Sequence, residues 1–198
     1  MSIHKRCWIR KVAPCMKDCD RVELRGAGEL CYTARRRELV MAEEIEDTRP
    51  DWDTYFMSIA HVVASRSNCS RRKVAAIIVA DRRIISTGYN GTPRGIKNCF
   101  EGGCPRCAGD AKSGSSLEEC LCLHAEQNAI CQAAFHGIRL AGSSIYVTLT
   151  PCLTCAKLIV SAGIREVIYT GSYAFDGQTQ KLFKDANILC RYFEMPTK

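Results

Sequence analysis

Two kinds of hydrophobic periodicity follow each other in the middle third of the chain. Residues 51–67 place apolar side chains at the spacing of an amphipathic helix, and Asp51 or Asp53 can cap its start. Residues 74–80 (VAAIIVA) form a nearly continuous apolar run, which predicts a buried strand. After a short turn, residues 84–88 return as a second strand. This part of the pattern therefore predicts one helix followed by two strands.

The later part of the chain alternates between helical and strand-like segments. Residues 123–136 are rich in good helix formers and stop before Gly137, which can end the helix. The segments that follow are a β-branched strand over 145–150, a helix that starts at Pro151, a strand over 166–170, a helix over 178–186 and a strand over 188–193. The order predicts an α/β fold, a three-layer α/β/α sandwich with a five-stranded mixed sheet. The helix between the last two strands allows a parallel crossover there.

The first part of the chain does not share this regular pattern. Residues 1–48 contain scattered cysteines, many basic residues, few strand signals and one predicted helix over 35–46. We therefore expect a basic N-terminal extension over 1–48 and a folded domain over 49–198. A cysteine-rich insert over 99–122 interrupts that domain.

Composition narrows the class of protein. The chain has 198 residues, of which 46% are hydrophobic and 25% charged, as in ordinary globular domains. No apolar run approaches the length of a membrane span, and the start of the chain lacks the apolar core of a secretory signal. We therefore expect a cytoplasmic protein with no membrane association, in which the 14 cysteines favour metal binding over disulfides. The net charge of +7 favours an anionic ligand such as a nucleotide or a nucleic acid.

The strongest chemical signal is the triplet His124-Ala125-Glu126 followed by Pro151-Cys152-Leu153-Thr154-Cys155. Structural zinc sites have four protein ligands, whereas catalytic sites leave one position for water. His124, Cys152 and Cys155 would supply three ligands, and Glu126 would move the protons of the activated water. This spacing is typical of zinc-dependent nucleobase deaminases. The alternative is a structural zinc knuckle with Glu126 on the surface.

A second group of cysteines lies in the insert, just before His124. Cys104 and Cys107 form a Cys-x2-Cys knuckle among glycine-rich turns. We expect a structural zinc site made by Cys99, Cys104, Cys107 and Cys122, with Cys120 as the alternative to Cys122. The metal would order a polar loop that lacks a core of its own. The competing interpretation is a set of free thiols or a redox pair.

From about residue 49 to its end, the sequence resembles the deoxycytidylate (dCMP) deaminases of the cytidine deaminase-like superfamily. The segments that carry the resemblance are RPDWDTYFMSIA, ISTGYNGTPRG, CLHAEQNAI, TPCLTCAKLIVSAGI and EVIYT. The resemblance implies a catalytic domain over 49–198 that hydrolyses dCMP to dUMP, which supplies thymidylate synthesis. It also implies that His124, Cys152 and Cys155 bind zinc and that Glu126 is the proton shuttle.

The resemblance also implies a set of substrate-binding residues. Asn90 would contact the sugar, the backbone around Ala125 and Thr150 would face the base, Arg66 and Ser67 would lie near the phosphate, and Tyr173 would lie near the substrate. The alternative interpretations are that Asn90 is an ordinary turn residue, that Arg66 is solvated and that Tyr173 has only a packing role. Many members of the family are hexamers activated by dCTP, for which Mg²⁺ is the expected counterion, and inhibited by dTTP.

Three other functions share parts of this signal. A tRNA or nucleic-acid adenosine deaminase would have the same zinc site, but it needs an open basic rim for a flipped base. The GYNGTP loop and the insert are atypical of that class, so a nucleic-acid partner is disfavoured. A non-catalytic zinc scaffold has no use for Glu126. A deaminase of cytidine, guanine or a riboflavin precursor would differ only in its loops.

Overall fold

The computed structural model describes residues 47–112, 115–171 and 177–196. Contacts divide the chain after Glu46, and all described residues belong to the second unit, Asp47–Lys198. The predicted helix over 35–46, the four cysteines of the extension and Tyr173 lie outside the described residues. None of the helices in the described ranges is both long and apolar enough to cross a membrane.

The order of the main helices and strands is the predicted one. The elements are α1 (Trp52–Ala64), β1 (Ala75–Ala80), β2 (Arg83–Tyr89), α3 (Ala125–Phe135), β3 (Ser144–Val147), α4 (Leu153–Ser161), β4 (Glu166–Tyr169), α5 (Gly177–Asp185) and β5 (Leu189–Tyr192). Three short helices, which the pattern did not predict, lie in the insert: η1 (Cys99–Glu101), α2 (Pro105–Ala108) and η2 (Leu117–Glu119).

The five strands form one mixed sheet in the order β2-β1-β3-β4-β5. β1 is antiparallel to both of its neighbours, β2 and β3. β3, β4 and β5 run parallel, so the predicted parallel crossover between the last two strands is confirmed. The carboxyl ends of β3 and β4 therefore lie at the same edge of the sheet.

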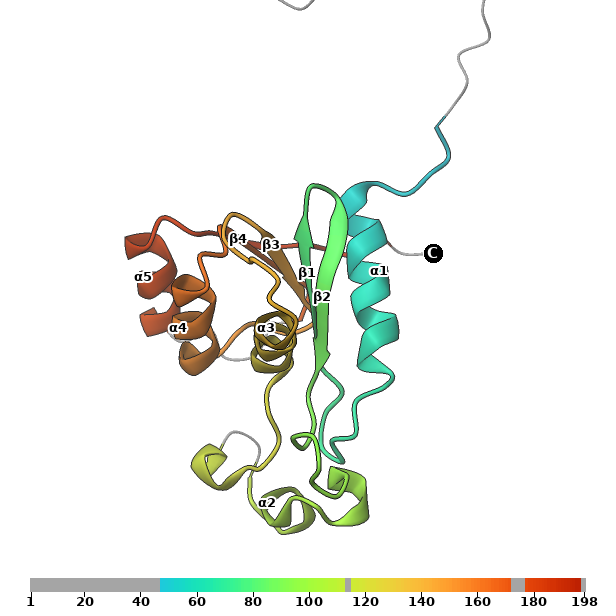
Figure 1. Cartoon of the computed structure of the whole chain (residues 1–198), viewed down its shortest axis with the longest axis vertical. Coiled ribbons are helices and arrows are strands. Elements are labelled where there is room, and N and C mark those ends of the chain that lie inside the picture. The colour runs from blue at the N-terminus through green and yellow to red at the C-terminus, as the bar shows by residue number, and fades with distance from the viewer. Residues whose placement is uncertain (1–46, 113–114, 172–176, 197–198) are drawn as a thin grey trace, which may run out of the picture. The chain divides into compact units, whose positions relative to one another are not determined.

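Helices cover both faces of the sheet, which confirms the three-layer sandwich (Figure 1). Along β1, Ile77 and Val79 pack with α1, whereas Ala76 and Ile78 face the helices on the other side. Because both faces of β1 are buried, its sequence is a continuous apolar run rather than an alternating one. Apolar residues of α3, α4 and α5 complete the larger of the two cores.

A polar network joins α1 to three strands. The Tyr146 hydroxyl donates to Asp53 Oδ1 at 2.8 Å, and Arg191 forms an ion pair with Asp53 at 2.8 Å. Arg191 also donates to Glu166 at 3.0 Å. Asp53 therefore links α1 to the sheet. Asp51 is the residue that caps α1, and it accepts a hydrogen bond from the backbone nitrogen of Thr54 at 2.9 Å.

Two helix boundaries differ from the predicted ones in a way that matters for the site. α4 begins at Leu153 with Cys152 as its N-cap, so Pro151 precedes the helix and is not its first residue. His124 is the N-cap of α3, one residue before its first turn, and Glu126 lies in that turn. Gly137 has a φ of 66°, which confirms it as the residue that ends α3.

Candidate functional site

Strand β2 holds the first turns of α3 against the sheet. The Asn128 side chain donates to the Tyr89 carbonyl at 2.7 Å, and the Ser86 hydroxyl donates to the Ala129 carbonyl at 2.7 Å. Gly88 lies so close to α3 that a Cβ there would be 2.3 Å from the backbone nitrogen of Ala129. The helix that carries Glu126 is therefore fixed by direct backbone contact with the sheet.

The three predicted zinc ligands converge at the starts of α3 and α4. His124 Nδ1 is 3.5 Å from Cys152 Sγ and 3.4 Å from Cys155 Sγ. Zn–S bonds of about 2.3 Å and Zn–N bonds of about 2.1 Å at a tetrahedral angle place such donor atoms about 3.6 Å apart. The donor set therefore fits a zinc ion. Among the described residues, this group has no fourth histidine, cysteine or carboxylate ligand.

The electrostatics of the three ligands favour a cation. Contact with the Cys155 thiol and the His124 ring lowers the pKa of Cys152 to about 4. The hydrogen bond to Cys152 raises the pKa of His124. Interaction with Cys152, together with burial, raises the pKa of Cys155. One thiolate thus forms readily, and the second forms when a bound metal ion compensates its charge.

Glu126 lies beside these ligands without belonging to their group. Its side chain is only 4% exposed, and burial raises its pKa to about 7. A carboxyl group with a pKa near the working pH can both accept and donate a proton. The alternative of a surface Glu126 in a structural zinc knuckle therefore does not hold.

A cavity of about 400 Å³ opens next to His124 and Glu126. This volume is in the range of small-molecule sites. Of the predicted substrate-binding residues, Asn90, Ala125 and Thr150 line the cavity. Arg66 is exposed and does not line it. Ser67 is not part of the lining either, and its hydroxyl contacts Asn90.

Asn90 is buried and held by its neighbours. Its Oδ1 accepts from the Ser67 hydroxyl at 2.7 Å and from the Val74 backbone at 2.8 Å. Its Nδ2 donates to the Arg72 carbonyl at 2.9 Å. Asn90 is therefore not a solvated turn residue, and Ser67 acts as a support for it.

The cations of the cavity are ones that the sequence pattern did not single out. Arg71, Arg72 and Arg106 line it. Arg71 Nε donates to the Cys107 carbonyl at 2.8 Å, and its Nη2 also bonds the Gly109 carbonyl. The sequence does contain the basic run Arg71-Arg72-Lys73, which could have drawn attention to this loop. Whether the run lies beside the cavity, however, depends on the tertiary structure.

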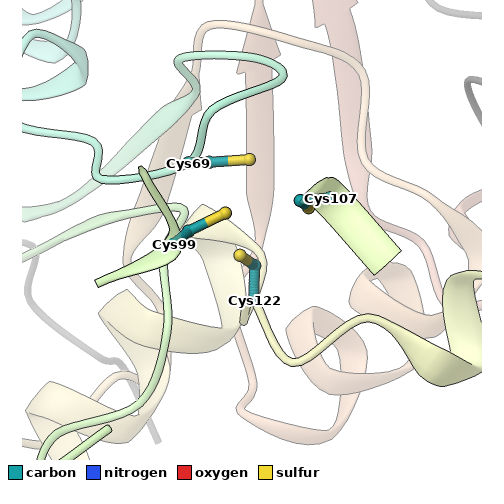
Figure 2. A group of neighbouring side chains, drawn as sticks. All are labelled: Cys69, Cys99, Cys107 and Cys122. Carbon is teal, nitrogen blue, oxygen red and sulfur yellow. The ribbon is translucent and has the colours of Figure 1, made fainter. Parts of the chain in front are cut away.

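Cys69 and the cysteines of the insert form two overlapping sets of four. One set is Cys69, Cys99, Cys107 and Cys122, and the other is Cys104, Cys107, Cys120 and Cys122. Figure 2 shows the first set converging from separate segments of the chain. Neither set is the predicted one of Cys99, Cys104, Cys107 and Cys122, because Cys99 belongs only to the first set and Cys104 only to the second. Cys120, the predicted alternative, belongs to the second set. Cys69, which no short motif marks, was missed.

Comparison with known proteins places these features in a family. A family model described as the cytidine and deoxycytidylate deaminase zinc-binding region matches residues 50–171. Deoxycytidylate deaminase of Saccharomyces cerevisiae is 49% identical over 146 residues, which cover 73% of this chain and 46% of that protein. The Schizosaccharomyces pombe enzyme is 47% identical over 149 residues, covering 75% of this chain and 46% of that protein. The chain therefore spans about half the length of these curated relatives.

A solved structure with bound nucleotides has the same fold. The crystal structure of dCMP deaminase from the cyanophage S-TIM5, in complex with dCMP and dUMP, aligns with a TM-score of 0.61 and 31% identity. The alignment covers 73% of this chain and 98% of the cyanophage chain. With the family model and the ligand geometry, this likeness shows that the chain belongs to the cytidine and deoxycytidylate deaminase family.

Proposed function

We propose that the chain catalyses the hydrolytic deamination of dCMP to dUMP with a zinc ion held by His124, Cys152 and Cys155. The observation that carries the proposal is the buried Glu126 beside a set of three candidate ligands, at a cavity that Glu126, His124 and Cys152 line. The dCMP and dUMP bound to the cyanophage relative and the names of the yeast relatives support the choice of substrate.

Zinc, when bound, supplies a water molecule whose pKa is lowered toward about 7. Glu126 would take a proton from this water as the oxygen of the water adds to C4 of cytosine. Glu126 would then deliver that proton to N3 of the ring. It would then transfer the remaining proton to the leaving amino group, so that ammonia departs and the C4 carbonyl of dUMP forms. The pKa of about 7 suits this alternation between base and acid.

The other residues of the cavity would orient the nucleotide. Within the described residues, Asn90 uses one amide hydrogen to bond Arg72, so the second is left for a substrate oxygen. The backbone of Ala125 and Thr150 would face the base. For the phosphate we propose Arg71, Arg72 and Arg106, which line the cavity, in place of Arg66.

Regulation and assembly form a further part of the proposal. The family resemblance supports activation by dCTP with Mg²⁺, inhibition by dTTP, a hexamer and a cytoplasmic location. Sedimentation with and without dCTP, together with initial rates at low dCMP concentration, tests the first three of these. A constant rate in the presence of either nucleoside triphosphate would contradict the regulatory part.

Ammonia release from a panel of substrates tests the proposed reaction. The panel is dCMP, CMP, deoxycytidine, dCTP and a tRNA anticodon stem, and we expect dCMP to have the highest kcat/KM. Arg72→Gln should lower kcat/KM for dCMP about 10- to 100-fold, the equivalent of a lost charge-assisted hydrogen bond, with little effect on deoxycytidine. Arg66→Gln is the matched control and should act like the unsubstituted enzyme. A preference for deoxycytidine or for the anticodon stem would refute the proposed substrate.

A further inference from the structure

In the described part of the insert, the buried side chains are all cysteines. Between residues 99 and 122, apart from the two positions outside the described ranges, the buried side chains are Cys99, Cys104, Cys107 and Cys122. The large apolar residues of the segment, Phe100, Leu117 and Leu121, are 64%, 42% and 49% exposed. A segment of this size without a hydrophobic core needs covalent or metal cross-links to keep one conformation.

Within each set of four cysteines, the sulfur atoms lie within 4.8 Å of one another. Cys104 and Cys107 are each 3.8 Å from Cys120 through their sulfur atoms. Four sulfur atoms at about 2.3 Å from one zinc ion are about 3.8 Å apart. A disulfide would need a sulfur–sulfur distance of about 2.05 Å. The spacing therefore fits metal coordination, and all six cysteines are free thiols.

The overlap between the two sets decides how many ions fit. Cys107 and Cys122 belong to both sets, whereas Cys69 and Cys99 belong to one and Cys104 and Cys120 to the other. One ion would use four thiols and leave the other two beside its ligands without a role. Two ions that share a pair of sulfur atoms use all six thiols and have four sulfur ligands each.

We propose that the six cysteines bind two zinc ions in a binuclear cluster in which Cys107 and Cys122 are the bridging ligands. An all-thiolate tetrahedral site selects zinc over the common hard divalent ions such as Mg²⁺ and Ca²⁺, which prefer oxygen ligands. The cluster is separate from the zinc site of His124 and does not depend on which nucleotide is the substrate.

Nearby groups suit the charge of such a cluster. Six thiolates exceed the positive charge of two zinc ions, so the cluster would be anionic. Arg71 donates to the carbonyl of Cys107 at 2.8 Å, and the hydroxyl of Ser70 lies 3.6 Å from Cys99 Sγ. Such outer groups orient thiolate ligands and compensate their charge.

The cluster would join the segments that build the nucleotide cavity. Cys69 comes from the loop after α1, and Cys122 lies two residues before His124. The neighbouring Leu123 pairs with Gly91 through a backbone bond of 2.9 Å. Four of the six cysteines line the cavity itself. The proposed role is therefore to hold the loop that contains Asn90 next to the start of α3.

Elemental analysis of the full chain tests the stoichiometry. Cys7, Cys15, Cys19 and Cys31 should first be replaced by serine, so that the extension contributes no thiols. We then expect about three zinc ions per chain, one in the catalytic site and two in the cluster. About two ions per chain would overturn the proposal in favour of a single structural ion. About one zinc ion, or iron with visible absorption, would also overturn it.

A spectroscopic measurement on the same protein tests the bridging arrangement with all six cysteines of the cluster in place. After exchange of zinc for cadmium, NMR should show three cadmium signals, of which the two from the cluster are coupled to each other through the shared sulfur atoms. Three signals without such coupling would contradict the bridging arrangement. Cys107→Ser and Cys122→Ser should each lose about two zinc ions, whereas Cys131→Ser, an exposed cysteine outside the cluster, should lose none.

Discussion

A single methyl group added at Gly88 should displace α3, the helix that carries Glu126. In Gly88→Ala, the new Cβ would lie 2.3 Å from the carbonyl oxygen of Ala125 and 2.3 Å from the nitrogen of Ala129. Ordinary contacts begin near 3.4 Å, so the start of α3 or strand β2 must move by about 1 Å. Gly88 does not have a positive φ, so its backbone conformation suits alanine and the effect comes from the close contact alone.

The displacement should affect both stability and catalysis. Overpacking of this kind costs about 1–3 kcal/mol of unfolding free energy. Because Glu126 follows Ala125 in α3, it moves with the helix relative to the metal ligands on α4. A shift of about 1 Å at a catalytic group can reduce kcat about 100-fold.

Thermal unfolding and steady-state kinetics on dCMP measure the two effects. Gly177→Ala is the matched control, because a Cβ there meets no atom of the described residues within 4 Å beyond its own neighbours, and its stability should stay within about 0.5 kcal/mol of the parent. A Gly88→Ala protein with parental stability and kcat would show that the contact between β2 and α3 does not position Glu126.

Three further predictions concern the framework, the substrate support and the metal. Arg191→Met should lower the unfolding free energy by about 1–3 kcal/mol, because Asp53 and Glu166 lose their charged partner, and an unchanged denaturation midpoint would contradict this. Ser67→Ala should raise KM for dCMP about fivefold with kcat nearly constant, because Asn90 loses a donor worth about 1 kcal/mol, and an unaltered KM would refute the supporting role. Removal of metal by a chelator should abolish deamination and added zinc should restore it, whereas activity that survives complete metal loss would contradict a zinc-dependent reaction.

The elements of the fold could be predicted because each has a simple local pattern. The continuous run over 74–80 predicted a buried strand, and the strand proved to be covered on both faces. His124, Cys152 and Cys155 could be proposed as zinc ligands from the two short motifs His-x-Glu and Pro-Cys-x-x-Cys, and the structure brings their donor atoms within 4.8 Å of one another. Pro151 was expected at the first helical position but lies two residues before it, because a proline next to an N-cap and a proline in the first turn give similar sequences.

The parts that could not be predicted depend on contacts between distant segments. Cys69 is 30 positions before Cys99, and only the path of the loop after α1 brings their sulfur atoms together. The same loop path places Arg72 in the lining of the cavity, whereas Arg66 does not line it. Local residue spacing contains no information about such a path, because the loop is held by polar side chains and not by a periodic apolar face.

The metal content and turnover of Glu126→Gln test the central claim most directly. The substitution keeps the size of the side chain and removes its ability to exchange protons, while the three metal ligands remain intact. We expect the variant to retain the zinc content of the parent and to lose about 10²- to 10⁴-fold in kcat on dCMP. A variant that binds the same zinc and still deaminates dCMP at the parental rate would contradict the role of Glu126 as the proton shuttle.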